Sequence, residues 1–312
     1  MQWMHKDLLD IDNLTAQEIE HILQTAVPMK EVLARPIKKL PTLRGKSIAL
    51  MFYESSTRTR TSFETAAKIL GADITNFSVA QSSVSKGESL LDTAKTLQAM
   101  NIDLVVIRHT SSGAPEFLAE WLTAGVINGG DGQHAHPTQA LLDYFTIKDH
   151  LGGFKGKKIL IIGDVLHSRV ARSNALGLKK LGAEVTFIGP PTLLSPEMKY
   201  LGVKISYDLD KELPGADAVM ALRLQLERQQ SGLVPSIREY NRLYGLTRER
   251  IEKTGKPTIV MHPGPMNRGV EIASDLADSV QSVIEEQVTN GVAVRMALIY
   301  LMIGGGTANV VD

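Results

Sequence analysis

Short apolar runs alternate with stretches of helical periodicity along most of the chain. The run Ser47–Met51 contains no charged residue and predicts a buried parallel strand. After it, apolar residues from Phe63 to Leu70 recur at helical spacing until Gly71 ends the pattern. The alternation continues and predicts further strands at 73–78, 104–107, 126–128, 158–162, 184–188, 203–206, 218–221 and 258–261.

Helices are predicted between these strands. Thr15-Ala16-Gln17-Glu18 has the pattern of a capping box and precedes an apolar face, so a helix is expected to start there. Pro137 suits the first turn of a helix that continues through Ile147. The long polar region 222–255 predicts one or two short helices and a loop over a site. Other helices are expected at 88–100, 115–123, 168–181 and 281–303.

The alternation of strands and helices predicts an α/β protein with two doubly wound parallel-sheet domains. A chain of 312 residues is long enough for two cores. The segment Leu151–Gly156 is rich in glycine and separates two sets of elements. We therefore expect one domain over residues 1–150 and a second over 151–280.

Composition and charge exclude several classes of function. Lys plus Arg number 34 and Asp plus Glu number 34, so no overall charge favours nucleic acid or an anionic membrane. The absence of cysteine excludes disulfides and thiolate zinc sites, and no metal site is expected. The apolar stretch Val292–Ile303 is interrupted by Arg295, and residues 1–7 lack the apolar core of a signal peptide. These features predict a cytoplasmic protein.

The segment Ser56-Thr57-Arg58-Thr59-Arg60 lies where the first strand turns into a helix. Free backbone N–H groups and the helix dipole favour an anion at such a turn. Three hydroxyl groups, together with the planar guanidinium of Arg58, match the oxygens of phosphate. An N-cap followed by surface arginines is the alternative interpretation, but three hydroxyls and two arginines in one turn favour phosphate binding.

Other polar residues follow neighbouring strands of the first predicted sheet. Arg108 ends one strand, and His136 and Gln139 follow the next. Because ligands bind beyond the carboxyl ends of parallel strands, these residues are expected to converge with Arg58 and Thr59. Taken singly, a histidine before a helix is more often a cap, and an arginine at a strand end is more often solvated.

The second predicted domain has a similar set. Arg169 follows the strand 158–162, where only Gly163 of a dinucleotide-binding Gly-x-Gly-x-x-Gly is present, so no nicotinamide cofactor is expected. Arg223 and Gln225 share a side if the chain after 218–221 stays extended. Two arginines could hold two carboxylates, although Arg223 and Gln225 alone could equally form a surface ion pair. The turn His262-Pro263-Gly264-Pro265 could direct carbonyl groups at a ligand or be a plain turn.

These motifs, in this order, resemble the aspartate/ornithine carbamoyltransferase family over nearly the whole chain. The resemblance implies that Ser56, Thr57, Arg58 and Thr59 form a phosphate-binding turn. It also implies that the first domain binds carbamoyl phosphate and the second L-aspartate, with an interdomain active-site cleft. The C-terminal helix, about 281–312, would pack back on the first domain. The motifs that carry the resemblance are Ser56 to Arg60, Arg108-His109, His136 to Gln139, Gly163-Asp164, Arg223 to Gln225 and His262 to Pro265.

The same resemblance assigns the remaining roles. Thr59, Arg108 and His136 would donate to the carbamoyl oxygen, and Gln139 with the carbonyls of Pro263 and Gly264 would hold the carbamoyl amide. Gly264 stands where some members carry leucine, but this contact is made through the backbone. Arg169, Arg223 and Gln225 would hold the two carboxylates of aspartate. Ser82 and Lys86 would be lent by a neighbouring chain of a homotrimer, although a lysine in a polar loop is ordinarily solvated.

The implied reaction is transfer of the carbamoyl group to aspartate, giving N-carbamoyl-L-aspartate and phosphate for pyrimidine biosynthesis. No cofactor is implied, and an assembly with regulatory chains or another pathway enzyme is left open. An ornithine-specific member is the nearest alternative, but such members usually carry a His-Cys-Leu-Pro motif, and Arg223 would repel a cationic side chain. A non-catalytic anion-binding protein is the other alternative, and it would not need His136 to Gln139.

Overall fold

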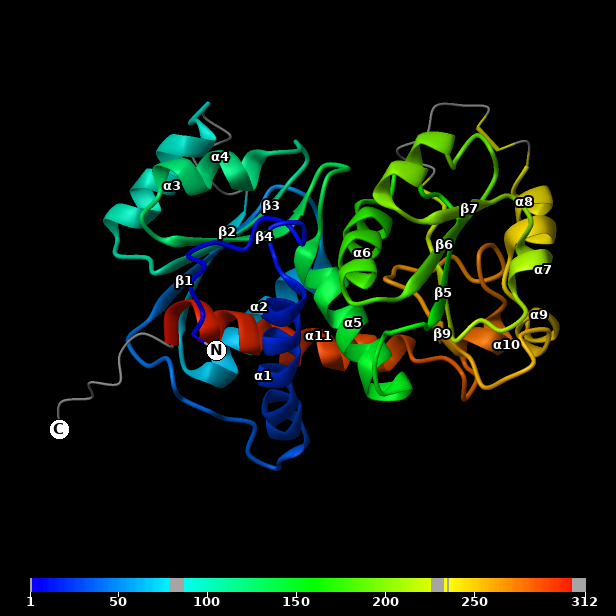
Figure 1. Ribbon diagram of the computed structural model, residues 1–312. Helices are drawn as coiled ribbons and strands as arrows, with labels where there is room; N and C mark the ends of the chain where they lie inside the picture. The colour runs from blue at the N-terminus through cyan, green and yellow to red at the C-terminus, as the bar shows by residue number, and fades with distance from the viewer. Residues whose placement is uncertain (1, 79–86, 226–232, 235, 305–312) are drawn as a thin grey trace. The chain divides into compact units, whose positions relative to one another are not determined.

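The computed structural model describes residues 2–78, 87–225, 233–234 and 236–304. The chain forms two compact units (Figure 1). Unit 1 comprises Met1–Leu142 and Val288–Asp312, and unit 2 comprises Asp143–Gln287. The divisions fall within helices α5 (Pro137–Leu151) and α11 (Ile284–Ile299), so each of these helices contributes to both units.

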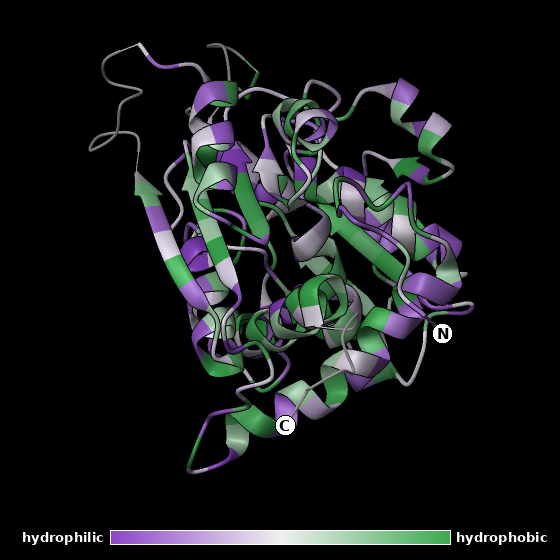
Figure 2. Cartoon of the chain, turned by 90° about the vertical axis from the view of Figure 1, so that its left-hand side faces the viewer, coloured by the Kyte–Doolittle hydropathy of each residue, from purple (hydrophilic) through white to green (hydrophobic). Residues whose placement is uncertain are grey.

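The sheet of unit 1 has four parallel strands in the order β2-β1-β3-β4. The chain around Leu8 lies along the outer edge of β4, where Leu8 N–H donates to Val126 O at 2.8 Å. The opposite edge strand, β2, mixes polar and apolar residues, whereas the neighbouring strand β1 is mostly apolar (Figure 2). The strands are β1 (Ser47–Phe52), β2 (Asp73–Ser78), β3 (Leu104–His109) and β4 (Gly125–Asp131).

Helices cover both faces of this sheet (Figure 1). α3 (Leu90–Ala99) and α4 (Ala114–Trp121) lie on one face. They pack through Leu97 and Leu118 onto side chains that alternate along β1 and β3, such as Met51 and Val105. The other face carries α1 (Ala16–Ala34), α2 (Thr57–Leu70) and α11. The predicted capping box of α1 is confirmed, because Thr15 and Glu18 exchange side-chain and backbone hydrogen bonds.

The C-terminal helix packs back on unit 1, as the resemblance implied. Arg295 of α11 is only 3% exposed and donates to Ser62 Oγ at 2.8 Å. Its guanidinium carbon lies 5.0 Å from the centre of the Phe63 ring. The helical run Ile284–Gly304 is 21 residues long and apolar enough by composition to cross a membrane. More than half of its most apolar stretch is buried inside the structure, and the core helix of a folded domain has the same length and composition.

The sheet of unit 2 has five parallel strands in the order β7-β6-β5-β8-β9. Its outer edge at β9 is extended by the segment before α11, because Val260 N–H donates to Gln281 O at 2.8 Å. The strands are β5 (Lys158–Ile162), β6 (Glu184–Ile188), β7 (Lys204–Ser206), β8 (Ala218–Ala221) and β9 (Ile259–Met261).

One hydrophobic cluster joins this sheet to four short helices. Leu160, Val219 and Val260 of the strands share it with Tyr240 and Leu276. Unit 2 also contains a longer helix, α6 (Arg169–Lys180). The four short helices are α7 (Leu209–Glu212), α8 (Ile237–Tyr244), α9 (Arg248–Glu252) and α10 (Ser274–Ala277).

The predicted fold class is confirmed, and so are all nine predicted strands. α8 and α9 are the short helices expected within 222–255. The sequence did not predict α7, α10 or the 3-10 helix η3 (Pro196–Leu201). A helix of four to six residues is too short to display an apolar period, so only packing in the tertiary structure reveals it.

Close packing of α5 on α6 within unit 2 depends on a glycine. A Cβ atom at Gly177 would lie 2.3 Å from the hydroxyl oxygen of Tyr144, which is fully buried and donates to Ser173 O at 2.6 Å. Alanine improves helix propensity by about 1 kcal/mol. Overpacking costs roughly 1–3 kcal/mol, and the rigid ring has nowhere to move. The packing cost should therefore prevail over the propensity.

Because a Cβ at 2.3 Å from a buried ring is a severe overlap, we predict an overpacking cost near the upper end of this range, so Gly177→Ala should lower the free energy of unfolding by about 2 kcal/mol in a urea titration. Gly153→Ala is the matched control, because a Cβ there meets no atom within 4 Å and its φ is not positive. That control should be neutral or slightly stabilising. A Gly177→Ala protein as stable as the parent would show that α5 and α6 can separate without cost.

Candidate functional site

Both units place loops at a point where the strand order reverses. In unit 1 the chain passes from β1 to β2 on one side, and β3 lies on the other side. In open α/β sheets, ligands bind beyond the carboxyl ends of the strands at such a switch point. Phe52 of β1 is in register with Arg108 of β3, and His109 is in register with Asp131 of β4. The predicted residues that follow β1, β3 and β4 thus share one edge.

The turn after β1 leads into α2, as predicted, and Ser56 is the N-cap residue of that helix. The Ser56 hydroxyl oxygen accepts a hydrogen bond from Thr59 N–H at 3.3 Å, which is the geometry of an N-cap. A hydroxyl that accepts in this way still has its own hydrogen to donate. Thr57 and Arg58 are exposed, whereas Thr59 is buried. The start of α2 therefore has the backbone and hydroxyl donors of an anion site.

Arg108, at the end of β3, is paired with a carboxylate that the sequence did not single out. Its Nη2 lies 2.5 Å from Glu54 Oε1, and its Nη1 donates to Gly129 O at 3.3 Å. The Arg108 and Glu54 side chains are only 12% and 19% exposed. A bound anion would therefore compete with Glu54 for this guanidinium. The sequence did indicate that Glu54 lies near the site, because it belongs to the same turn as Ser56.

His136 and Gln139 lie at the start of α5, where Pro137 is the first helical residue. Both side chains are buried, and the His136 carbonyl accepts from Gln139 N–H at 3.1 Å. Nearby, burial lowers the pKa of His109, whose Nδ1 accepts from Ser111 N–H at 2.9 Å. His109 is therefore favoured as a neutral ring with its proton on Nε2.

In unit 2 the strand order reverses between β5 and β8, and the predicted residues again follow these strands. Arg169 is the first residue of α6 and is 5% exposed. Gln225 follows β8, and its side-chain amide donates to His167 O at 3.2 Å. The fully buried Asp164 accepts from His167 Nδ1 at 2.8 Å and from Gln225 N–H at 3.3 Å. One carboxylate thus ties the loop after β5 to the loop after β8.

The turn after β9 is fixed by a buried histidine and glutamate. Gly264 N–H donates to His262 Nδ1 at 2.8 Å, so that nitrogen carries no proton. His262 Nε2 then donates to Glu271 Oε1 at 3.1 Å, and both side chains are at most 1% exposed. Gly264 has a φ of 64°, which favours glycine at this position. The backbone of Pro263 and Gly264 is therefore held by side chains that the sequence did not identify as a pair.

The structure gathers two sets of predicted residues, one at the carboxyl edge of each sheet. Ser82 and Lys86 lie outside the described residues. In the described part of the chain, no group of three or more His, Cys, Asp or Glu side chains could hold a metal ion. The two sets are Ser56, Thr57, Arg58, Thr59, Arg108, His136 and Gln139 in unit 1, and Arg169, Arg223, Gln225, Pro263 and Gly264 in unit 2.

Fold and site together define a class: an α/β protein with a phosphate-type helix start in one unit and arginines at the switch point of the other. Two family models match the chain. One is described as "Aspartate/ornithine carbamoyltransferase, carbamoyl-P binding domain" and covers residues 6–149. The other is described as "Aspartate/ornithine carbamoyltransferase, Asp/Orn binding domain" and covers residues 155–302. The chain belongs to the aspartate/ornithine carbamoyltransferase family.

Individual proteins and structures agree with this membership. The chain is 69% identical to the aspartate carbamoyltransferase catalytic subunit of Desulfitobacterium hafniense over the full length of both. It is 61% identical to that of Moorella thermoacetica, over 98% of this chain and 99% of the relative. The aspartate transcarbamoylase of Trypanosoma cruzi, in complex with carbamoyl phosphate and aspartate, matches with a TM-score of 0.85 at 28% identity, covering 96% and 97% of the chains. An ornithine carbamoyltransferase from Pyrococcus furiosus matches with a TM-score of 0.87 at 29% identity, covering 98% and 100%.

Proposed function

We propose that this protein transfers the carbamoyl group of carbamoyl phosphate to the amine of L-aspartate. The products are N-carbamoyl-L-aspartate and phosphate, and the reaction belongs to pyrimidine biosynthesis. The observation that carries the proposal is the full-length 69% identity to a catalytic subunit of this name. The residues at the two switch points supply donors and positive charge of the kind that both substrates need.

Unit 1 is assigned to carbamoyl phosphate. The start of α2, with Ser56, Thr57 and Arg58, binds the phosphate group through hydroxyls, backbone N–H groups and a guanidinium. Thr59, Arg108 and His136 donate to the carbamoyl oxygen. Gln139 binds the carbamoyl amide.

In this proposal, most of the rate acceleration comes from stabilising the negative charge that develops on the carbamoyl oxygen. Attack of the amine on the carbamoyl carbon builds negative charge on the carbamoyl oxygen, and phosphate then leaves. A donor fixed in advance at such an oxygen commonly contributes about 10²–10³ in rate. The proposal needs no covalent intermediate between substrate and protein, because the amine itself is the nucleophile. Orientation of the two substrates lowers the remaining barrier.

Unit 2 is assigned to aspartate, whose two carboxylates are held by Arg169, Arg223 and Gln225. The fold cannot separate this acceptor from ornithine, since an ornithine carbamoyltransferase matches the chain as well as an aspartate transcarbamoylase does. Arg223 favours an acidic acceptor, because a second cation would be repelled there.

The proposal also includes the assembly and its setting. Three identical chains form a trimer, and each active site receives Ser82 and Lys86 from the neighbouring chain. The protein is cytoplasmic and works without a cofactor or metal. The first domain, residues 1–150 with about 281–312, binds carbamoyl phosphate, and the second, 151–280, binds aspartate.

The direct test is phosphate release from carbamoyl phosphate with a panel of amino acids. We expect release with L-aspartate and formation of N-carbamoyl-L-aspartate, and no release above background with L-ornithine. Turnover of ornithine without aspartate would assign the chain to the other branch of the family. Tight phosphate binding without turnover of any amine would favour a non-catalytic anion-binding protein.

Arg223→Ala should weaken aspartate binding and leave carbamoyl phosphate binding intact. Loss of a charge-assisted contact costs about 2 kcal/mol or more, so the KM for aspartate should rise by roughly 30-fold or more. Arg248→Ala is the control, because that arginine is exposed and pairs with Asp275 at 3.1 Å on the surface of unit 2. An unchanged KM for aspartate in Arg223→Ala would remove Arg223 from the acceptor site.

Mixed trimers test the shared site. Lys86→Ala chains and His136→Ala chains should each be nearly inactive alone, because each lacks one donor at every site. After subunit exchange, some sites combine an intact His136 with an intact Lys86 from a neighbour, so part of the activity should return. The measurement is the turnover of the mixture, with exchange verified by mass. No recovery after verified exchange, or an active species with the mass of one chain, would exclude sharing.

A further inference from the structure

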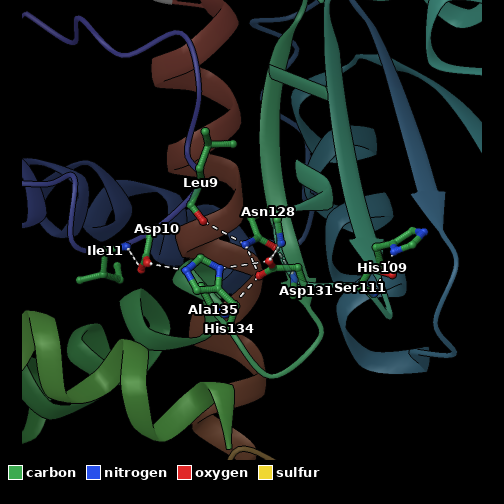
Figure 3. Close-up of polar contacts among 11 residues, drawn as sticks. Leu9, Asp10, Ile11, His109, Ser111, Asn128, Asp131, His134 and Ala135 are labelled. Atoms are coloured by element: carbon green, nitrogen blue, oxygen red, sulfur yellow. Dashed lines mark hydrogen bonds and ion pairs between the residues drawn. The ribbon is translucent and has the colours of Figure 1, made fainter. Parts of the chain in front are cut away.

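A buried carboxylate lies beneath the loop that carries His136. Asp131 ends β4 and is 1% exposed. Its Oδ1 accepts from Asn128 Nδ2 at 2.7 Å and from Ala135 N–H at 3.1 Å. Its Oδ2 accepts from Gly113 N–H at 2.7 Å and from His134 Nδ1 at 3.1 Å. Figure 3 shows Asn128, His134 and Ala135 gathered around this carboxylate.

These hydrogen bonds close the loop immediately before His136. Asp131 N–H donates to Ala135 O at 3.1 Å, and His134 N–H donates to Asp131 O at 3.0 Å. The backbone of Asp131 and Ala135 forms a single antiparallel bridge. Ala135, four residues after Asp131, is therefore held by both the backbone and the side chain of Asp131. His136 is the next residue.

The same carboxylate connects this loop to two other parts of unit 1. Gly113 is the N-cap residue of α4, so its bond to Asp131 fixes the start of that helix. Asn128 also donates to Leu9 O at 2.9 Å, and His134 Nε2 lies 3.4 Å from Asp10 Oδ2 (Figure 3). Both the N-terminal segment and α4 therefore limit where the loop can lie.

We propose that Asp131 is a positioning residue for His136 in the carbamoyl transfer. This inference rests on the proposed function, in which His136 donates to the carbamoyl oxygen. Asp131 acts through the loop and not on the substrate. A displacement of about 1 Å in a donor can cost on the order of 10²-fold in rate. A purely structural role would lower stability but leave the turnover of folded protein unchanged.

Asparagine is the informative replacement. An amide has one acceptor oxygen, so it can keep the partners of either Oδ1 or Oδ2 but not both pairs. Turning the Asn128 amide would not restore the pattern, because Asn128 Oδ1 already accepts from Gly130 N–H at 2.7 Å. Asp131→Asn keeps the size of the side chain, but it must leave at least one backbone N–H donor, that of Gly113 or that of Ala135, without its acceptor.

The matched control is Asp103→Asn. Asp103 Oδ2 accepts from Ser47 N–H at 2.9 Å and its Oδ1 pairs with Lys46 Nζ at 2.9 Å, at the amino ends of the strands. It undergoes the same chemical change at the edge of the sheet opposite His136. Its turnover number should equal that of the parent protein.

The experiment is a double-mutant cycle with His136→Ala, measured by steady-state kinetics well below the unfolding temperature of every variant. Asp131→Asn should lower kcat by about 10-fold or more. The KM for carbamoyl phosphate should change by less than about 3-fold, since the hydrogen bonds of Asp131 do not involve the turn after β1. In the His136→Ala background the same substitution should cause no further loss, because the residue through which it acts is absent.

An unchanged kcat in Asp131→Asn, or an equal loss in both backgrounds, would overturn the proposal. If Asp131→Asn does not fold, His134→Ala replaces it, because the His134 side chain is 45% exposed and its removal deletes one of the four donors. That variant should lose at least about 2-fold in kcat, again only when His136 is present. An unchanged kcat in His134→Ala would then overturn the proposal. A parent protein without carbamoyl transfer would refute the proposed function itself, which separates the two failures.

Discussion

Parallel strands leave all their carboxyl ends at one edge of a sheet, and both units of this protein depend on that constraint. A residue after β1 and a residue after β4 are some 80 positions apart in the chain, as Ser56 and His136 are, yet they share one edge. The strand order reverses within each sheet, so the loops on either side of the reversal diverge and leave room for a ligand. In each unit, the direction and order of the strands are enough to bring these loops together.

Loops at such an edge must still be held in one conformation, and buried carboxylates do this in both units. Asp131 and Asp164 each accept hydrogen bonds from backbone N–H groups of neighbouring loops, and Glu271 holds the ring that fixes Gly264. Both carboxylate oxygens of Asp131 and of Asp164 accept hydrogen bonds, as a charge in a dry site requires, and hydrogen bonds to a charged acceptor are strong and strict in geometry. Donors carried by the loops are therefore placed before a substrate arrives.

Glu54 is a different kind of acid, because it pairs with the cation that the site offers. Its contact with Arg108 pairs a cationic side chain that is only 12% exposed. Removal of either partner alone would leave a poorly hydrated charge, which is costly. The site thus contains a carboxylate of the protein itself, Glu54, in addition to the substrate anions that it is expected to bind.

Much of the fold followed from the sequence alone. Local patterns of residues can be read directly from the sequence. They predicted the nine strands, the capping box at Thr15 and the turn from strand to helix around Ser56. The family motifs also predicted which loops carry the chemistry. The strand order, the short helices α7 and α10, and the contact of Arg295 with Ser62 join residues far apart in the chain, so no local period encodes them. The acids that hold the loops were missed for the same reason: Asp131 and Glu271 look like ordinary polar residues until folding buries them and brings their donors within reach.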